Sequence, residues 1–315
     1  MLAVLLVGLS LVQTSVAQSI TTFTATPYAF NSQTGSTTFS YTLTNVADGN
    51  VTLNVQDSQA VVVRTLMSNA TQSSGSYNAS WDGKDDASQA VPEGIYTAVL
   101  TVSISGDVDI NAQTNVLVDN TKPTVTINVP KDGASYTLNS SVSADYSCSD
   151  PGATPSGVPP ENCVGTVASG SNIDTSTAGP HTFKVTATDN AGNTFTQTVT
   201  YNVGYKFSGF LPPLKVKGKQ QTLQFKAGST IPVKFQLADN NGNYISTATA
   251  QIWVDSNSTA GKSSGGANKQ NYFRYDTTSN QYIFNLSTKG LAKGSHIIIV
   301  TLNDGTTYSV KITLK

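Results

Sequence analysis

The chain has 315 residues, of which 12% are charged, and its formal net charge at pH 7 is −1. A net charge this close to zero gives no electrostatic basis for binding nucleic acid or an anionic membrane surface. The length exceeds that of one small sandwich domain and suits about three modules of roughly 100 residues. Residue types that favour pleated sheets are plentiful, and no long segment after the N-terminus shows a 3.6-residue apolar period. We therefore predict an all-β chain.

Residues 1–17 have the pattern of a secretory signal peptide. Met1 to Val12 is almost wholly apolar, and Ser15-Val16-Ala17 offers small residues at the positions that a signal peptidase inspects. We expect cleavage before Gln18, although no Lys or Arg precedes the apolar run, which leaves an uncleaved anchor as the alternative. The run is short for a membrane span and no second spanning stretch follows, so we predict a mature chain without a membrane span, secreted or held at the cell surface.

The first module is predicted at residues 18–119. Phe39, Tyr41 and Leu43 alternate with polar residues as in a half-buried strand, and Asp48-Gly49 is a turn signal. The run from Ala60 to Leu66 is more continuously apolar, which predicts a central strand. About seven short strands separated by turns predict an immunoglobulin-like sandwich.

The sequence from Ser80 to Ala87, followed by Val91 to Tyr96, resembles the Ig-like domain of flagellar hook-capping proteins. That domain also occurs in many secreted proteins, so the resemblance implies a structural role. Within this stretch, clustered carboxylates would suit a calcium loop, and the residues concerned are Asp82, Asp85 and Asp86. Lys84 occupies a position where the helix-loop-helix calcium pattern needs an acid, so we favour turn hydrogen bonds for these carboxylates.

The second module is predicted at residues 120–204. Its opening, Asp119 to Pro123, and its hairpin from Gly179 to Asn193 are similar to the Ig-like repeats of bacterial and archaeal cell-surface proteins. Cys148 and Cys163 are the two cysteines of the chain, and an even pair in an exported protein predicts a disulfide. Closing a loop of this length is worth about 3 kcal/mol by the chain-entropy estimate. A metal pair or a redox pair has no support, because neither a Cys-x-x-Cys motif nor a nearby His cluster is present.

The resemblance to surface repeats carries a hypothesis about Asp119 and Asp189. In related tandem repeats, acidic residues at the joint and in the last hairpin turn lie together, and a calcium ion there would stiffen the joint between domains. The alternative is that both carboxylates bond to nearby backbone amides and to water. The sequence alone favours this alternative, and calcium is the one cofactor that we consider for the chain.

The third module is predicted at residues 205–315. Ile231 to Leu237 alternates as a strand, and we expect two hairpins after it, the second around Asn303-Asp304-Gly305. The run from Phe225 to Phe235, with its Pro232-x-Lys234-Phe235 signature, resembles the PxKF domain that ends many secreted proteins. The complete prediction is therefore three tandem immunoglobulin-like β-sandwiches after an N-terminal signal segment.

Motifs for catalysis are missing from the sequence. It contains no Gly-x-Ser-x-Gly, no His-Glu-x-x-His and no glycine-rich phosphate loop, and we expect His181 and His296 to be exposed residues at strand starts. We therefore predict that the protein is not an enzyme. Six sequons are candidate glycosylation sites, at Asn50, Asn69, Asn78, Asn139, Asn257 and Asn285.

These observations predict an exported, non-enzymatic protein that acts as a spacer, adhesion or matrix component, with other envelope or extracellular proteins or glycans as partners. One alternative is a flagellar or pilus accessory protein, suggested by the first module. Another is a carbohydrate-binding accessory protein, which would require Trp253, Tyr272 and Tyr275 to be exposed on one flat face.

Overall fold

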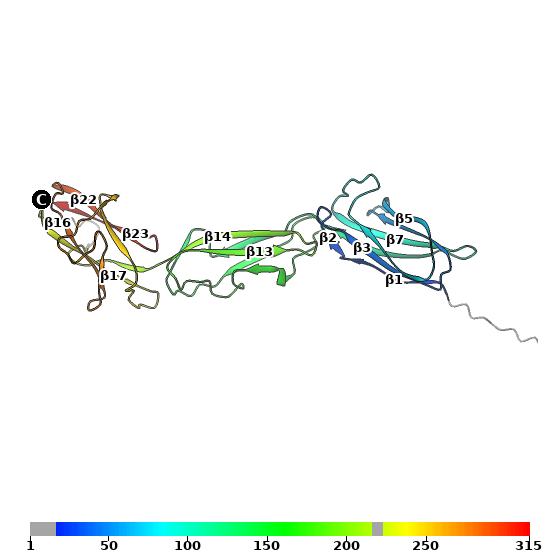
Figure 1. Cartoon of the computed structure of the whole chain (residues 1–315), viewed down its shortest axis with the longest axis horizontal. Helices are drawn as coiled ribbons and strands as arrows, with labels where there is room; N and C mark the ends of the chain where they lie inside the picture. The colour runs from blue at the N-terminus through cyan, green and yellow to red at the C-terminus, as the bar shows by residue number, and fades with distance from the viewer. Residues whose placement is uncertain (1–16, 216–222) are drawn as a thin grey trace, which may run out of the picture. The chain divides into compact units, whose positions relative to one another are not determined.

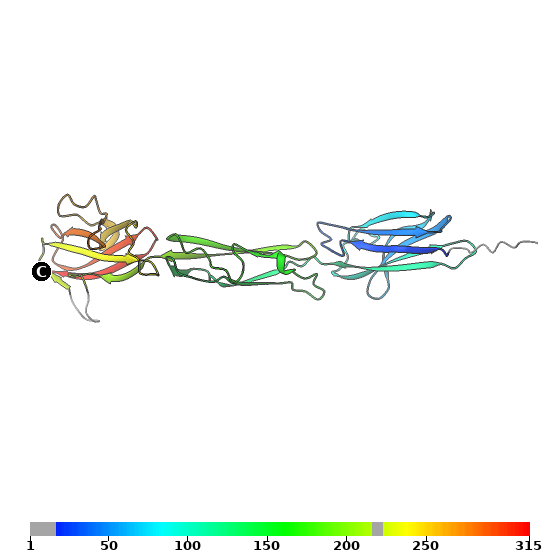
Figure 2. The ribbon, with the colours of Figure 1, turned by 90° about the horizontal axis from the view of Figure 1, so that it is seen from below.

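The computed structural model describes residues 17–215 and 223–315, apart from the side chains of residues 257 and 258. Within these ranges the regular structure is all β, with one short 3₁₀ helix, η1 (Pro160–Asn162). The strands form three successive immunoglobulin-like sandwiches, labelled in Figure 1 and seen from a second side in Figure 2. No helix in the described ranges is long and apolar enough to cross a membrane. The predicted signal segment lies outside the described residues, except for Ala17.

The described chain divides into two compact units. The first contains the residues through Thr124 together with Cys148–Cys163 and Ala187–Phe195. The second contains Val125–Ser147, Val164–Thr186 and Thr196–Lys315. The second sandwich contributes segments to both units. A site therefore belongs to one unit only when all of its residues lie in the segments of that unit.

The first sandwich has a three-stranded and a five-stranded sheet. The three-stranded sheet has the order β1 (Ser19–Thr26), β3 (Thr37–Thr44), β6 (Gly75–Trp81). The five-stranded sheet has the order β2 (Ala29–Phe30), β8 (Ile110–Val118), β7 (Gly94–Ser103), β4 (Gly49–Gln56), β5 (Val62–Gln72). Strands β3, β4 and β7 bury every second residue, as the alternation in the sequence predicts.

Trp81 fills one end of the first core. Its ring is 1% exposed and meets Tyr96 edge-on with the ring centroids 5.2 Å apart, and Phe30 with the centroids 5.8 Å apart. The indole N–H donates to the carbonyl oxygen of Lys84 at 2.8 Å, so its polar atom is satisfied inside the core. The adjacent Gly83 has a φ of +74°, and a Cβ added there would lie 2.4 Å from that of Ser32. Packing in the core therefore accounts for Trp81, and the close approach of Ser32 accounts for Gly83.

The prediction of a central strand at Ala60 to Leu66 is wrong. This segment begins β5, which is the edge strand next to β4, and Val61 and Val62 are 57% and 43% exposed. The free side of β5 is partly covered by the loop that carries Asp86. The Asp86 amide donates to the carbonyl of Val63 at 3.0 Å, while its carboxylate accepts the Thr65 amide at 3.0 Å. An apolar run can thus belong to an edge that is protected by a loop.

The second sandwich has a four-stranded and a two-stranded sheet. The order in the larger sheet is β10 (Ala134–Thr137), β14 (Thr194–Gly204), β13 (Gly179–Thr188), β12 (Cys163–Gly165). The smaller sheet pairs β11 (Asp145–Ser149) with β9 (Thr124–Val129). Strands β13 and β14 form the long hairpin in Figures 1 and 2, which buries Phe183, Val185 and Ala187.

The third sandwich has a four-stranded and a five-stranded sheet. The first has the order β15 (Lys206–Phe210), β17 (Thr230–Ala238), β21 (Gln281–Ser287), β20 (Arg274–Asp276). The second has the order β16 (Leu223–Phe225), β23 (Thr307–Leu314), β22 (Gly294–Leu302), β18 (Ala250–Val254), β19 (Ser256–Ala260). The predicted hairpins are present, because β20 pairs with β21 and β22 pairs with β23. Phe235 of the Pro-x-Lys-Phe signature is fully buried and stacks on Tyr282 with the ring centroids 5.2 Å apart.

Replacing Trp81 with alanine tests the packing of the first sandwich. Loss of a buried indole costs about 3–5 kcal/mol, so one calorimetric transition of the full chain should move down by more than about 10 °C. Tyr28→Ala is the control, because that ring is 51% exposed and its removal should shift no transition appreciably. Unchanged transitions in Trp81→Ala would contradict the packing described here.

Candidate metal centre

Three aspartates, each directly after the last residue of a strand, meet in the first compact unit. Asp119 follows β8, Asp150 follows β11 and Asp189 follows β13. One carboxylate oxygen of each lies within 4.8 Å of those of the other two. Asp119 is 1% exposed and Asp189 is 3% exposed, while Asp150 is half-buried. The structure therefore brings together the two aspartates singled out in the sequence and adds a third that sequence reasoning missed.

Backbone amides hold two of these carboxylates in place. Oδ1 of Asp189 accepts the amides of Ala191 and Asn193 at 2.9 and 2.8 Å, and its Oδ2 accepts the side-chain amide of Asn193 at 2.8 Å. Oδ2 of Asp119 accepts the amide of Ser156 at 2.8 Å. The expected turn chemistry is thus present, and it orients the carboxylates without neutralising their charge.

Asp150 is less well satisfied than its two neighbours. Its Oδ2 accepts the Gly157 amide at 2.6 Å, but its Oδ1 is buried and has no hydrogen-bond partner. Burial raises the pKa of Asp150 above its ordinary value, and the negative charges of Asp119 and Asp189 add to the rise. None of the ion pairs among the described residues involves the three carboxylates. A bound cation would supply the missing partner and the missing charge.

The third sandwich contains the same turn without the acidic neighbours. The turns at residues 189–193 and 239–243 both read Asp-Asn-x-Gly-Asn. Asp239 also accepts the amides of Asn241 and Asn243, each at 2.9 Å, and the side-chain amide of Asn243 at 3.0 Å. Its Oδ2 additionally accepts the side-chain amide of Asn139 at 3.0 Å. Asn139 and Asn243 lower the pKa of Asp239 to about 2, so this turn is complete without a cation.

The donor set at the three aspartates fits a hard divalent cation. Calcium takes six to eight oxygen ligands, and two oxygens on one ion lie at most about 5.2 Å apart. The carboxylate oxygens of the three aspartates lie within 4.8 Å of one another, which satisfies that bound. The residues that would hold the ion are Asp119, Asp150 and Asp189, with water completing the coordination.

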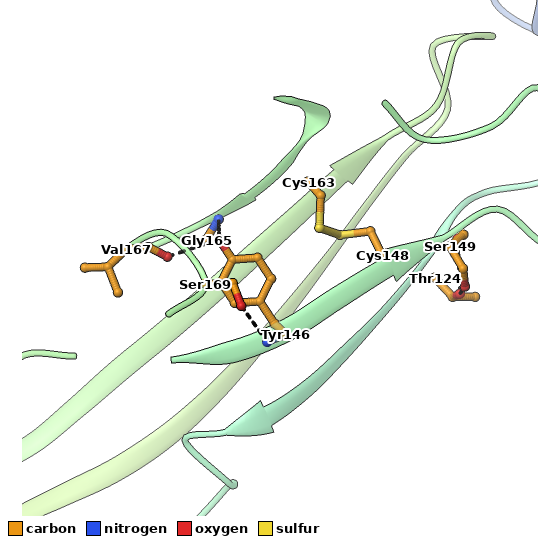
Figure 3. The surroundings of a disulfide bond; sticks show 8 residues. All are labelled: Thr124, Tyr146, Cys148, Ser149, Cys163, Gly165, Val167 and Ser169. Carbon is orange, nitrogen blue, oxygen red and sulfur yellow. Dashed lines mark hydrogen bonds between the residues drawn. A yellow bond between two sulfur atoms is a disulfide. The ribbon is translucent and has the colours of Figure 1, made fainter. Parts of the chain in front are cut away.

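The disulfide closes the loop that carries the third aspartate. Cys148 in β11 and Cys163 at the start of β12 are bonded, with Cα atoms 5.8 Å apart (Figure 3). Next to the disulfide, the hydroxyls of Thr124 and Ser149 lie 2.7 Å apart. The bridge joins β11 of the two-stranded sheet to β12 of the four-stranded sheet, and it closes only the short loop between these two strands. The bridge of immunoglobulin domains proper also joins two sheets, but it connects strands that are far apart in the sequence.

The other acidic cluster considered in the sequence consists of separate turn contacts. Oδ1 of Asp82 accepts the amide of Lys84 at 3.2 Å, and Oδ1 of Asp85 accepts the amide of Gln89 at 2.8 Å. The carboxylate of Asp86 faces β5 and lies 3.9 Å from the Arg64 guanidinium. These carboxylates are not among the described groups that could share one ion.

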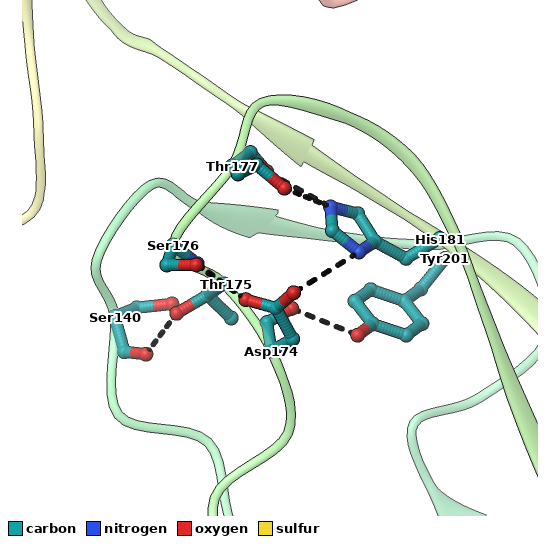
Figure 4. Close-up of polar contacts among 7 residues, drawn as sticks. All are labelled: Ser140, Asp174, Thr175, Ser176, Thr177, His181 and Tyr201. Atoms are coloured by element: carbon teal, nitrogen blue, oxygen red, sulfur yellow. Dashed lines mark hydrogen bonds and ion pairs between the residues drawn. The ribbon is translucent and has the colours of Figure 1, made fainter. Parts of the chain in front are cut away.

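His181 lies near the start of β13, as predicted, but its side chain is half-buried rather than exposed. Its imidazole stacks on Tyr201 with ring centroids 5.1 Å apart, and its Nδ1 lies 3.9 Å from Asp174 (Figure 4). Its Nε2 is 2.8 Å from the Thr177 carbonyl oxygen. A carbonyl only accepts hydrogen bonds, so Nε2 carries a proton and cannot take one from the Thr177 hydroxyl at 3.4 Å. Ser176 bonds to Asp174 rather than to the imidazole, which is not the arrangement of a hydrolase triad.

His296 lies near the start of β22, as predicted, but it is buried, at 8% exposure, and not exposed. Its Nδ1 is 2.7 Å from Oδ2 of Asp255 and its Nε2 is 2.8 Å from the carbonyl oxygen of Ala292. Both partners accept hydrogen bonds, so the imidazolium satisfies them best. The Ala292 carbonyl and the Asp255 carboxylate together raise the pKa of His296.

The aromatic residues considered for carbohydrate binding do not share one face. Trp253 lies on β18 in the five-stranded sheet of the third sandwich, whereas Tyr275 lies on β20 in the four-stranded sheet. Tyr275 packs edge-on against buried Tyr282 with the ring centroids 5.0 Å apart. Tyr272 is 41% exposed and is bridged to Gln251 of β18. These positions do not provide the flat platform that the hypothesis needs.

The candidate glycosylation sites differ in accessibility. Four of the asparagines are exposed, namely Asn50, Asn69, Asn78 and Asn139. Asn285 is half-buried in β21, and the side chain of Asn257 lies outside the described part of the chain. Asn139 already uses its amide to bond Asp239.

Residues 26–106 match the family model described as the FlgD Ig-like domain. No curated protein matches the chain. Fibronectin(III)-like modules of CbhA from Clostridium thermocellum are 18% identical, with 59% of this chain and 94% of theirs covered and a TM-score of 0.34. A bacterial ice-binding adhesin is 14% identical, with 96% and 100% covered and a TM-score of 0.32. A tetra-tandem repeat from a large adhesion protein is 16% identical, with 95% and 75% covered and a TM-score of 0.31. At these scores the structural likenesses carry no information about function.

The His296 pair predicts how the stability of the third sandwich depends on pH. Because the folded pKa of His296 is raised above 6.5, its contribution is fully present below that pH and is lost as the pH rises through the folded pKa. We expect the melting temperature to fall from pH 6 to pH 9 more steeply in the wild type than in His296→Gln or Asp255→Asn. Equal slopes in calorimetry of the three full-length chains would contradict this assignment.

Proposed function

We propose that this chain is an exported, non-enzymatic protein that acts as a spacer, adhesion or matrix component, secreted or at the cell surface. The observation that supports the proposal most directly is a succession of three sandwiches, each with its own sheets. Both histidines of the chain are engaged in local contacts that support their own sandwich. Sandwiches of this kind present loops and sheet edges at their surface, where contacts with other extracellular proteins or glycans form.

A flagellar or pilus accessory role is the second candidate. It is favoured by one observation, the match of residues 26–106 to the FlgD Ig-like domain. The match concerns the first sandwich alone, so it is equally compatible with a general structural role. The two candidates differ in where the protein is found: an accessory protein would copurify with filaments, whereas a spacer or matrix protein would not.

Cell fractionation of the source organism tests the proposed location. Immunoblotting of washed cells, shed surface material, medium and cytosol should place the mature chain in the medium or the surface fraction. Detection with sheared flagella or pili would favour the second candidate. Recovery in the cytosol, beside a cytosolic marker enzyme, would contradict export.

We also propose that Asp119, Asp150 and Asp189 bind one calcium ion and that the ion fixes the start of the connection from β8 to β9. Three carboxylates within 4.8 Å, two of them almost fully buried, repel one another unless a cation lies between them. The segment from Asp119 to Thr124 connects β8 to β9, so an ion held by Asp119 would fix the start of that connection. Extracellular modules bind calcium with dissociation constants on the order of 10⁻⁴ to 10⁻³ M, and we expect this range.

Calcium should raise the melting temperature of the full chain. At a free concentration of 10 mM, about 100 times a dissociation constant at the tight end of that range, the ion adds about 2.7 kcal/mol. We expect an upward shift of several degrees in calcium chloride relative to EDTA, and its loss in Asp189→Asn. Asp239→Asn is the matched control. Asp239 lies in the same kind of turn, but its neighbour is the Asn139 amide and not a carboxylate, so this variant should keep the calcium response.

Two outcomes would count against the calcium proposal. One is a wild-type melting temperature that does not change between EDTA and calcium chloride. The other is an equal loss of the calcium response in Asp189→Asn and Asp239→Asn, because the response would then come from somewhere else. Magnesium chloride at the same concentration separates a specific ion from general salt screening, which calcium and magnesium provide equally.

A further inference from the structure

The loop of residues 149–162 lies between the two cysteines and carries Asp150. We infer that the Cys148–Cys163 disulfide positions this loop so that Asp150 becomes the third ligand, and that the disulfide thereby sets the affinity for calcium. This inference rests on the proposed calcium site and adds the element of the fold that completes it.

Contacts join the loop to the turn that holds Asp189. The amide of Asn190 donates to the Gly157 carbonyl at 2.9 Å, and the Asn190 side-chain amide donates to the Ser156 carbonyl at 2.8 Å. The Ala191 amide donates to the hydroxyl oxygen of Ser156 at 3.2 Å. The same part of the loop donates to the carboxylates, through the amides of Ser156 and Gly157. The loop therefore contacts both the turn that carries Asp189 and the carboxylates of Asp119 and Asp150.

The loop has little packing of its own to hold it there. None of the residues 149–162 is fully buried, and its regular structure is the one turn of η1 at Pro160–Asn162, with Ser149 ending β11. A segment without a buried apolar side chain gains little from the hydrophobic effect. Closing its ends at Cys148 and Cys163 removes much of the conformational freedom that it would otherwise have. The covalent closure is thus a constraint, beside the hydrogen bonds of Ser156 and Gly157, that opposes the repulsion of Asp150 by the other two carboxylates.

The unpaired oxygen of Asp150 is a second observation that indicates a ligand at this position. Oδ1 is sealed from solvent without a hydrogen-bond partner, although the other oxygen of the same carboxylate is bonded to the loop. A buried carboxylate oxygen without a donor is unfavourable, and a calcium ion would satisfy it. Without the disulfide the loop can turn Asp150 toward water, which leaves Asp119 and Asp189 as the remaining carboxylate ligands.

A double-mutant cycle on the full-length chain tests this coupling. The four proteins are the wild type, Asp150→Asn, Cys148→Ser/Cys163→Ser and the combined triple variant, each titrated with calcium chloride while the melting temperature is recorded. We expect Asp150→Asn and the double Cys variant each to weaken apparent calcium affinity about tenfold or more. The triple variant should match Asp150→Asn, because the disulfide acts through that carboxylate. The melting temperature in EDTA reports any purely structural cost separately.

The outcomes separate this inference from the proposed site. If the wild type shows no calcium response, the proposed site itself fails. If the wild type responds and the double Cys variant keeps its affinity, or if the losses add in the triple variant, the site stands and the coupling is overturned. Should the Cys variant fail to fold, the folded wild type is titrated with calcium chloride before and after a thiol reductant has opened the disulfide. We expect reduction to weaken the apparent calcium affinity of the wild type but not that of Asp150→Asn, and an unchanged affinity in the reduced wild type would overturn the inference.

Discussion

The structure around the proposed site depends on one constraint, the need of a buried carboxylate for partners. Asp189 and Asp239 occupy the same position in two turns of the pattern Asp-Asn-x-Gly-Asn, and in each the turn amides bond one carboxylate oxygen. At Asp239 the remaining demand is met by the Asn139 amide, which is neutral and needs no ion. At Asp189 the neighbours are carboxylates instead, and a cation, as we propose, would offset their charge. One difference in the neighbouring side chain thus separates a structural turn from a candidate ion site.

The sandwich architecture explains why three separated aspartates meet. Asp119, Asp150 and Asp189 each follow the end of a strand, and the strands fix where the chain leaves the sheets. Contacts of the connections themselves then orient the carboxylates, as the Ser156 and Gly157 amides do for Asp119 and Asp150. In this arrangement local turn bonds and the proposed ion binding are compatible at one carboxylate: the amides fix its orientation, and the ion would take the lone pairs that remain.

Patterns within strands could be predicted from the sequence, while placement between distant segments could not. The alternation from Ile231 to Leu237 follows the period of a pleated strand, and the structure buries these side chains accordingly. The apolar run before Leu66 has no alternation that distinguishes an edge from a centre, and its protection by the loop at Asp86 is a tertiary contact. His296 was misjudged because its partner, Asp255, is 41 residues away. Asp150 was missed because no recognisable sequence motif surrounds it, whereas Asp189 lies in a repeat motif. Its two partners in the site lie in distant segments of the sequence.

The disulfide and the proposed ion suit the same environment, and this agreement links the site to the function. A loop without buried residues needs its covalent closure, which persists in oxidising compartments. Calcium sites with dissociation constants on the order of 10⁻⁴ to 10⁻³ M are characteristic of extracellular modules. Asp150 lies inside the loop that the disulfide closes and is also a proposed ligand of the ion. The proposed site would therefore be complete only after the two cysteines have been oxidised outside the cytoplasm. A site that is completed there is consistent with the proposed role as an extracellular spacer.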